Sequence, residues 1–209
     1  GVPCSQAALP DGRWAQIAGD FQRYAPDFQA YGGSPHELQP LASLVLCVQH
    51  LHAFGQAVSV AALMRHAISH GLGSVTDDLR LVNGVTLEGL TRLLAEFGLP
   101  AHLERGYSLE DLAHTVETGA AVLIAVNAST LWSVSSAGEH RDANHVIRVT
   151  AVARDVATGE VLGFLVDDVL THECGRFVAA EPISPNAQMF LDPEQIDSVD
   201  ESRIPGYLP

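Results

Sequence analysis

Lysine is absent from the sequence: all 11 basic residues are arginines, against 25 acidic residues. This absence excludes lysine Schiff-base chemistry, pyridoxal phosphate attachment and a Walker-type phosphate loop. The formal net charge is −14 and the arginines form no cluster, so neither nucleic acid nor an anionic membrane is expected as a partner. Arg105, Arg141 and Arg148 are candidates for contact with an anionic substrate, although solvated surface arginines are the commoner case.

Cysteines and long apolar runs are also scarce. The three cysteines, Cys4, Cys47 and Cys174, are too scattered for a disulfide framework, so we expect mostly buried thiols in a reducing cytoplasm. No charged-then-apolar leader opens the chain, and no run reaches the roughly 18 apolar residues of a membrane helix. The motifs GxSxG, HExxH and GxGxxG are missing, which removes the hydrolase and nucleotide-binding interpretations that depend on them.

Helical patterns fill the first part of the chain. Pro40 precedes the apolar run LASLVLCVQHLHAFG, which predicts a mostly buried helix with proline at its start and Gly55 at its end. In a second segment, 108–117, Ser108 and Asp111 have the spacing of a capping box. Further helices are predicted over 14–24, 59–70 and 86–97.

After Gly119 the spacing of apolar residues changes to that of strands. We predict strands over 120–127, 145–155, 161–168 and 176–180, the second and third joined by a turn at 157–160. Helices followed by antiparallel strands predict an α+β domain. We expect an N-terminal extension with a short helix at 1–40, a core at 41–181 and an acidic C-terminal tail at 182–209.

The histidines raise the question of a metal site. His66 and His70 are four residues apart and would share one face of their predicted helix, a spacing that can bind zinc. His172 and Cys174 are two residues apart in a predicted loop. No third ligand is evident near either pair. Surface side chains are therefore the preferred interpretation, and neither a metal nor another cofactor is expected.

A more informative constellation joins two distant segments. His145 opens a predicted strand, and the strand paired with it ends in Asp167-Asp168. A histidine beside an aspartate at neighbouring strand ends is typical of a general base that serves a thiol at a helix N-terminus. The buried helix that should carry this thiol has Ala42 in its first turn and no cysteine there. The alternative without catalysis is a satisfied core histidine and carboxylates that cap a turn.

These segments together resemble the papain-like cysteine peptidases of the bacterial type that trims double-glycine leader peptides, and their stand-alone relatives. In that family a Cys-Gly or Cys-Ser pair opens the first core helix and an aromatic-Gly pair closes it. Here Ala42-Ser43 and Phe54-Gly55 fall on those positions. The segment NHVIRVTAVARDVATGEVLGFLVDD is similar to the family's His strand, turn and Asp strand. The resemblance covers residues 39–180.

The resemblance implies a papain-like fold, in which a helical half with the nucleophile helix packs on an antiparallel β-sheet. It implies His145 as the general base, Asp168 as its orienter with Asp167 as second choice, and Ala42 at the nucleophile position. The implied activity is cysteine-dependent acyl transfer by a peptidase, an acyltransferase or a thioester cyclase. Its substrate would be a peptide or an acyl thioester, free or on a carrier protein.

The sequence departs from the family pattern at Ala42, which has no nucleophile, and at His36, where family members often have an oxyanion-stabilising glutamine. Three explanations remain open. The cysteine was replaced by engineering, the protein is a natural pseudoenzyme that only binds a peptide or a carrier protein, or the nucleophile is displaced. The candidates for a displaced nucleophile are Ser43, Cys47 and Cys4, of which Cys47 is interpreted as a buried core thiol.

Overall fold

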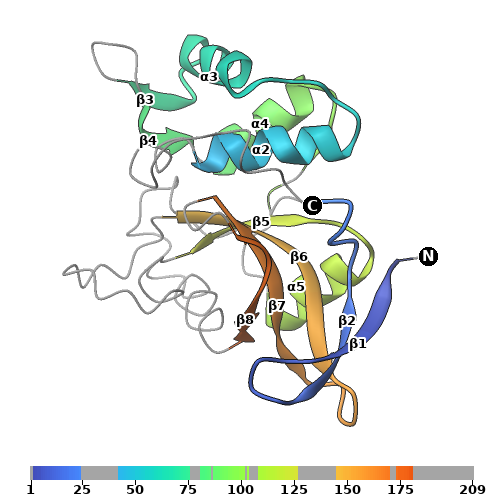
Figure 1. Cartoon of the computed structure of the whole chain (residues 1–209). Coiled ribbons are helices and arrows are strands. Elements are labelled where there is room, and N and C mark those ends of the chain that lie inside the picture. The colour runs from blue at the N-terminus through green and yellow to red at the C-terminus, as the bar shows by residue number, and fades with distance from the viewer. Residues whose placement is uncertain are drawn as a thin grey trace, which may run out of the picture.

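The computed structural model describes residues 2–24, 42–75, 81–85, 87–101, 103, 108–126, 145–169 and 173–180. Figure 1 shows a helical layer above a curled antiparallel sheet, with helix α5 against the sheet below. The helices are α2 (Ala42–Ala53), α3 (Val60–Ser69), α4 (Leu87–Glu96) and α5 (Leu109–Glu117). The strands are β1 (Cys4–Ala8), β2 (Trp14–Ala18), β3 (Gly73–Val75), β4 (Leu81–Val85), β5 (Val122–Val126), β6 (His145–Asp155), β7 (Val161–Asp168) and β8 (Glu173–Ala179). The predicted α+β class is confirmed.

The helix ends lie close to their predicted places because local capping interactions set them. After α2 comes Gly55, whose φ of +83° favours glycine and whose N–H donates to the carbonyl of His52. Helix α3 begins after Ser59. The Ser59 hydroxyl accepts a hydrogen bond from the Ala62 N–H in the first turn of the helix. The predicted capping box of Ser108 and Asp111 begins α5. The helices predicted from Pro40 onward are confirmed.

Strand β6 is the centre of the main sheet, whose order is β1-β2-β6-β7-β8. The first half of β6 pairs with β5 and its second half with β2. Between these halves the register with β7 shifts after Val149, and Gly19 packs at this point, where a Cβ would lie 2.3 Å from the Thr150 carbonyl oxygen. Such an irregularity bends a strand, so that β6 can pair with β5 along its first half and with β2 along its second half. The bounds predicted for β6 and β7 are confirmed.

Two hydrophobic clusters lie on opposite faces of β6. Val146, with Leu123 of the neighbouring β5, packs in the cluster that contains α2, α3 and α4. Ile147 and Val149 pack in a second cluster with α5. Because neighbouring strand residues point to opposite faces, β6 lies between the helical layer and α5 (Figure 1). Among the described residues, no helix has the length and hydropathy needed to cross a membrane.

The helix predicted over 14–24 is wrong, because Trp14–Ala18 forms strand β2. Ala15 is fully buried while Trp14 and Gln16 are exposed, which is the two-residue period of a strand. The turn before it contains Gly12 with a φ of +87° and joins β2 to β1 as a hairpin. Since β2 pairs with β6, this part of the N-terminal segment belongs to the main sheet.

Four further strands differ from the prediction. Strands β3 and β4, which pair in a small sheet of their own, and strand β1 were not predicted, because β1 and β3 are short with small residues and Asn83-Gly84 interrupts β4. Strand β8 begins at Glu173 instead of Arg176, so Cys174 lies in a strand and the loop predicted for it is wrong. The reason is Gly175, which has a φ of +64° beside an irregularity in the β7–β8 register and interrupts the strand pattern.

The packing of the helical layer on the sheet can be tested at Leu123, which is fully buried in the α2 cluster. We expect Leu123→Ala to lower the free energy of unfolding by about 2–5 kcal/mol, because it leaves a cavity between β5 and α2. Urea denaturation measures the change. The control Val156→Ala, at a residue 45% exposed, should change it by less than about 0.5 kcal/mol. Equal effects of the two substitutions would contradict this packing.

Candidate functional site

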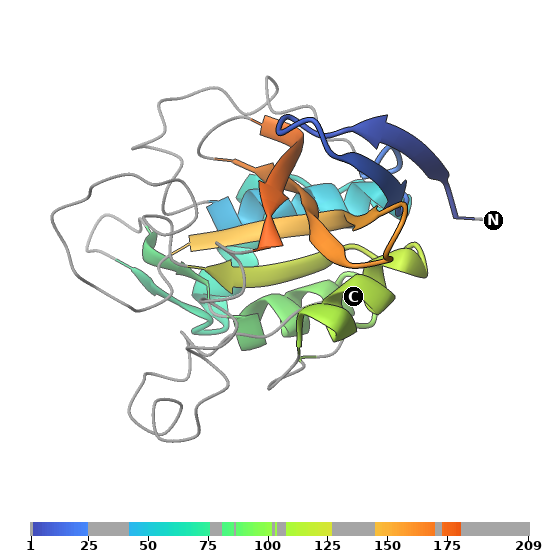
Figure 2. The same cartoon turned by 90° about the horizontal axis from the view of Figure 1, so that it is seen from below.

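The three residues of the predicted site begin or end the elements that carry them. Ala42 is the first residue of α2, His145 the first of β6 and Asp168 the last of β7. The side chains of Ala42 and His145 lie outside the described part of the structure. Figures 1 and 2 place the beginnings of α2 and β6 at the same end of the molecule.

One core cluster contains a near neighbour of each predicted site residue. Leu44 follows the start of α2, Val146 follows His145 and Val169 follows Asp168, and all three belong to the same cluster. Leu44 and Val169 are buried members of the cluster, and Val146 packs against the cluster as a partly buried residue. The cluster thus links α2, β6 and β7, the three elements that carry the predicted site residues.

Arg148 and Asp167 form a buried ion pair beside this cluster. They are register partners on β6 and β7, and their side chains are 0% and 1% exposed. The Arg148 Nε donates to Asp167 Oδ2 at 3.1 Å, and Nη2 lies 3.0 Å from the same oxygen. The Gly175 N–H of β8 donates to Asp167 Oδ1 at 2.9 Å. Burial raises the pKa of Asp167, and the Arg148 guanidinium opposes that rise.

Asp167 and Asp168 therefore have different surroundings. Both are buried, and as consecutive strand residues they point to opposite faces of the sheet. The carboxylate of Asp167, the second choice as orienter of His145, is held by Arg148 and by the backbone of Gly175. Asp168 is fully buried on the other face. By the same alternation Asp167 shares the α2-facing side of the sheet with Val146 and Val169, whereas Asp168 lies on the side of α5, so Asp168 as the orienter stays a prediction.

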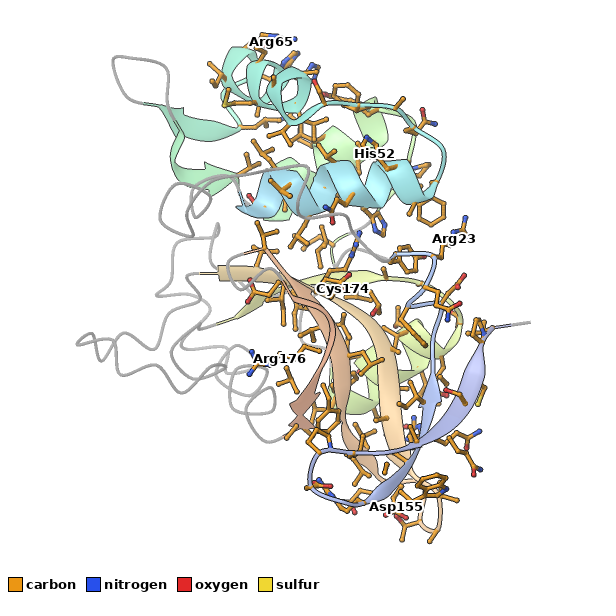
Figure 3. All side chains as sticks on the ribbon, in the orientation of Figure 1. Arg23, His52, Arg65, Asp155, Cys174 and Arg176 are labelled. Atoms are coloured by element: carbon orange, nitrogen blue, oxygen red, sulfur yellow. The ribbon has the colours of Figure 1, made fainter. Side chains whose placement is uncertain are left out.

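Arg148 also binds the segment that precedes α2. Its Nη2 donates to the carbonyl oxygen of Tyr24 at 2.5 Å. The Tyr24 ring stacks on the ring of His50 in α2, with centroids 5.6 Å apart and an interplanar angle of 7°. Figure 3 shows the neighbouring Arg23 at the C-terminal end of α2, where its Cζ lies 4.4 Å from the centroid of the Phe54 ring. These contacts connect the sheet to α2.

The expectation of a solvated surface arginine is wrong for Arg148. Its guanidinium is removed from water because Asp167 and the Tyr24 carbonyl supply the negative charge and the acceptor that water would otherwise provide. An arginine this deeply buried is not placed to meet a substrate from solution. Arg105 and Arg141 lie outside the described residues.

The candidates for a displaced nucleophile are engaged or distant. Cys47 is fully buried, and burial raises the pKa of its thiol to about 12, which confirms the interpretation as a core thiol. The Ser43 hydroxyl accepts a hydrogen bond from the Val85 N–H of β4 at 3.4 Å. Cys4 is exposed on β1, at the far side of the molecule from the start of α2 (Figures 1 and 2). The two candidates on α2, Ser43 and Cys47, are thus both buried in the core.

The histidine pair of α3 forms a surface cluster with α4. The rings of His66 and His70 stack with centroids 4.0 Å apart, and His66 Nε2 is hydrogen-bonded to the carboxylate of Glu96. His172 lies outside the described residues, while the Cys174 thiol is hydrogen-bonded to the Asp167 carboxyl group. In the parts of the chain that the structure describes, no group of three acidic, histidine or cysteine side chains is arranged to hold a metal ion.

Comparison with known proteins supplies no family for this chain. No protein-family model matches the sequence, and a search of curated proteins finds no significant relative. The papain-like resemblance therefore depends on the residues and spacings of this chain alone.

Sequence inspection did not single out the Arg148–Asp167 pair, although a signal for it exists. The turn after β6 places Arg154 opposite Val161, and counting back along both strands from this pair leads to Arg148 and Asp167. Two register irregularities lie between, but they offset each other, so the count still holds. Opposite charges in register on two apolar strands indicate a buried pair.

The importance of the buried pair can be tested with Arg148→Met. We expect this change to lower the free energy of unfolding by about 3–5 kcal/mol, because it leaves Asp167 as a buried charge without its partner. Urea denaturation of the purified variant measures it. A matched control is Arg154→Met, because Arg154 binds Glu110 and Glu117 but is partly exposed, and its loss should cost about 1 kcal/mol or less. A larger loss at Arg154 would contradict the assignment.

The thiol environments predict an order of reactivity with iodoacetamide at pH 8. Cys4 should be alkylated first because it is exposed. Cys174 should follow, since burial and the Asp167 charge raise the pKa of its thiol to about 11. Cys47 should react only after denaturation in urea, because it is buried and its pKa is about 12. Mass spectrometry of the alkylated peptides measures the order, and alkylation of Cys47 in the folded protein would contradict it.

Proposed function

We propose that the chain is a papain-like domain for cysteine-dependent acyl transfer, of the peptidase, acyltransferase or thioester-cyclase type, with Ala42 at the position of the nucleophile. The observation that supports it is the shared core cluster of Leu44, Val146 and Val169. These residues are chain neighbours of Ala42, His145 and Asp168, and they join the three elements that carry the predicted site in one core. The order of elements along the chain, helix first and then a His strand and an Asp strand, agrees with the proposal.

In this proposal a cysteine at position 42 supplies the chemistry. The helix dipole at the start of α2 lowers the pKa of a thiol there. The thiolate attacks the carbonyl carbon of a peptide, an ester or a thioester, and the N–H groups at the helix start stabilise the oxyanion. His145 accepts the thiol proton and passes it to the leaving group, while Asp168 fixes the imidazole tautomer. Water, an amine or another nucleophile then takes the acyl group.

Ala42 has no thiol, so no covalent intermediate can form there, and the chain with alanine at this position is inactive in this chemistry. The alanine at position 42 also leads to a second candidate function, a non-catalytic module that binds a peptide or a carrier protein. It is favoured by the engagement of Ser43 with Val85 and by the burial of Cys47, the two candidates for a replacement nucleophile on α2. A cysteine codon at position 42 of the parent gene would exclude this second function.

The catalytic proposal is tested by Ala42→Cys. We expect the introduced thiol to react with iodoacetamide at pH 7 at least about tenfold faster than Cys4, because the helix start and His145 favour the thiolate. The variant should also turn over a generic thioester. Mass spectrometry measures the alkylation at each cysteine, and release of the free thiol measures the turnover.

Two further variants make the result specific. In the Ala42→Cys background, His145→Ala should abolish the rapid alkylation and the turnover. Ser43→Cys is the matched control, because it places a thiol one residue further along the same helix, at a side chain that faces β4. An introduced thiol at position 42 that reacts no faster than the one at position 43 would reject the catalytic site and leave the binding module as the better account.

A further inference from the structure

Strand β1 forms an outer edge of the main sheet. It pairs with β2 alone among the described elements, and Figures 1 and 2 show it at the outside of the sheet. Four of its five residues are exposed. The edge is therefore accessible to another strand.

The hydrogen bonds of the hairpin show which groups of β1 point outward. The carbonyl of Pro3 and the N–H of Leu9 both bond inward, to the chain that leads into or out of β2. Because inward and outward groups alternate along a strand, the odd-numbered residues of β1 bond to β2. The N–H and C=O groups that point away from the sheet therefore belong to the even-numbered residues Cys4, Gln6 and Ala8.

Strand β1 lacks the features that normally keep a sheet edge from pairing. Its sequence, CSQAA, contains no charged residue and no proline, and its register with β2 has no irregularity. Strand β8, at the opposite edge, contains Glu173 and Arg176 and has a register irregularity beside Gly175. Charges and bulges are the usual protection of an edge. By this comparison β8 is protected and β1 is open.

The charge distribution favours β1 as the place where two copies can meet. A chain with a formal net charge of −14 repels a second copy over most of its surface. Across residues 2–18, however, the charged side chains are Asp11 and Arg13, which form an ion pair at 2.6 Å. Beside the edge, Trp14 is 53% exposed, and its Nε1 donates to the Gln6 side chain at 3.2 Å. The hairpin thus offers a neutral surface with exposed apolar area.

We propose that the chain forms a two-fold symmetric dimer in which β1 pairs antiparallel with β1 of a second copy, with Gln6 at the symmetry axis. In this register Gln6 faces Gln6 of the second copy, and Cys4 faces Ala8. Every outward N–H and C=O group of β1 is then paired, and the two sheets become continuous. A single strand edge buries less than the roughly 800 Å² per partner of a standard interface, so the dimer is weak and concentration-dependent.

Sedimentation velocity over chain concentrations up to about 1 mM tests the proposal. The expected result is a reversible monomer–dimer equilibrium that a reducing agent does not change. In the proposed register Cys4 faces Ala8 of the second copy and not the second Cys4, so no disulfide joins the two chains. Gln6→Pro removes an outward N–H and leaves the inward bonds to β2 intact, since an edge strand tolerates proline where the N–H faces solvent. We expect it to weaken dimerisation at least about tenfold, because the hydrogen bonds at the axis are lost.

A matched pair of charge variants guards against a folding defect in the proline variant. Gln6→Lys places two like charges opposite each other at the axis and should weaken the dimer. Gln16→Lys is the control, since Gln16 is the exposed cross-strand partner of Gln6 but lies on β2, inside the sheet. It should leave dimerisation within about twofold. A monomer at all concentrations, or a dimer that responds equally to both lysine variants, would overturn the proposal.

Discussion

A buried arginine and a buried aspartate are stable together only while both stay in place, and the rest of this structure depends on that constraint. Arg148 and Asp167 fix the register between β6 and β7. A slip of one residue would separate the charges and would also turn Asp168 to the other face of the sheet. Since Gly175 and Tyr24 bind the same pair, β8 and the segment before α2 are held by it as well.

Helix α2 is the second fixed part of the molecule. Residues 43–51 are all buried, so the helix has little freedom to rotate or shift in its surroundings. Polar contacts set its orientation as well: Ser43 is bonded to β4, and His50 stacks on Tyr24. The position of Ala42 at its start therefore follows from the packing of the whole helix. A site at this place would be preorganised, which is what the chemistry proposed for it requires.

The sequence predicts most of the central fold, and the misses have physical causes. Helices with strong apolar periodicity and caps, such as the one that begins at Ser108, were predicted close to their ends. The hairpin of β1 and β2 was missed because its strands are short and carry small residues, so propensity favoured a helix over 14–24. For the candidate site, the backbone places of Ala42, His145 and Asp168 follow from the pattern. The partner of Asp167 is a tertiary contact between strands, which residue types alone do not give.

The pairing of β2 with β6 has a consequence for how the chain is made. Ala15 pairs with Asp155, so the hairpin of β1 and β2 finds its neighbour in the sheet only after β6 has been synthesised. Contacts between such distant segments make folding slow. Until then the hairpin has two free edges in place of one, and a nascent chain would need a chaperone or a neighbouring segment to cover them. The main sheet is therefore expected to close only after β6 has been made, well after its first hairpin.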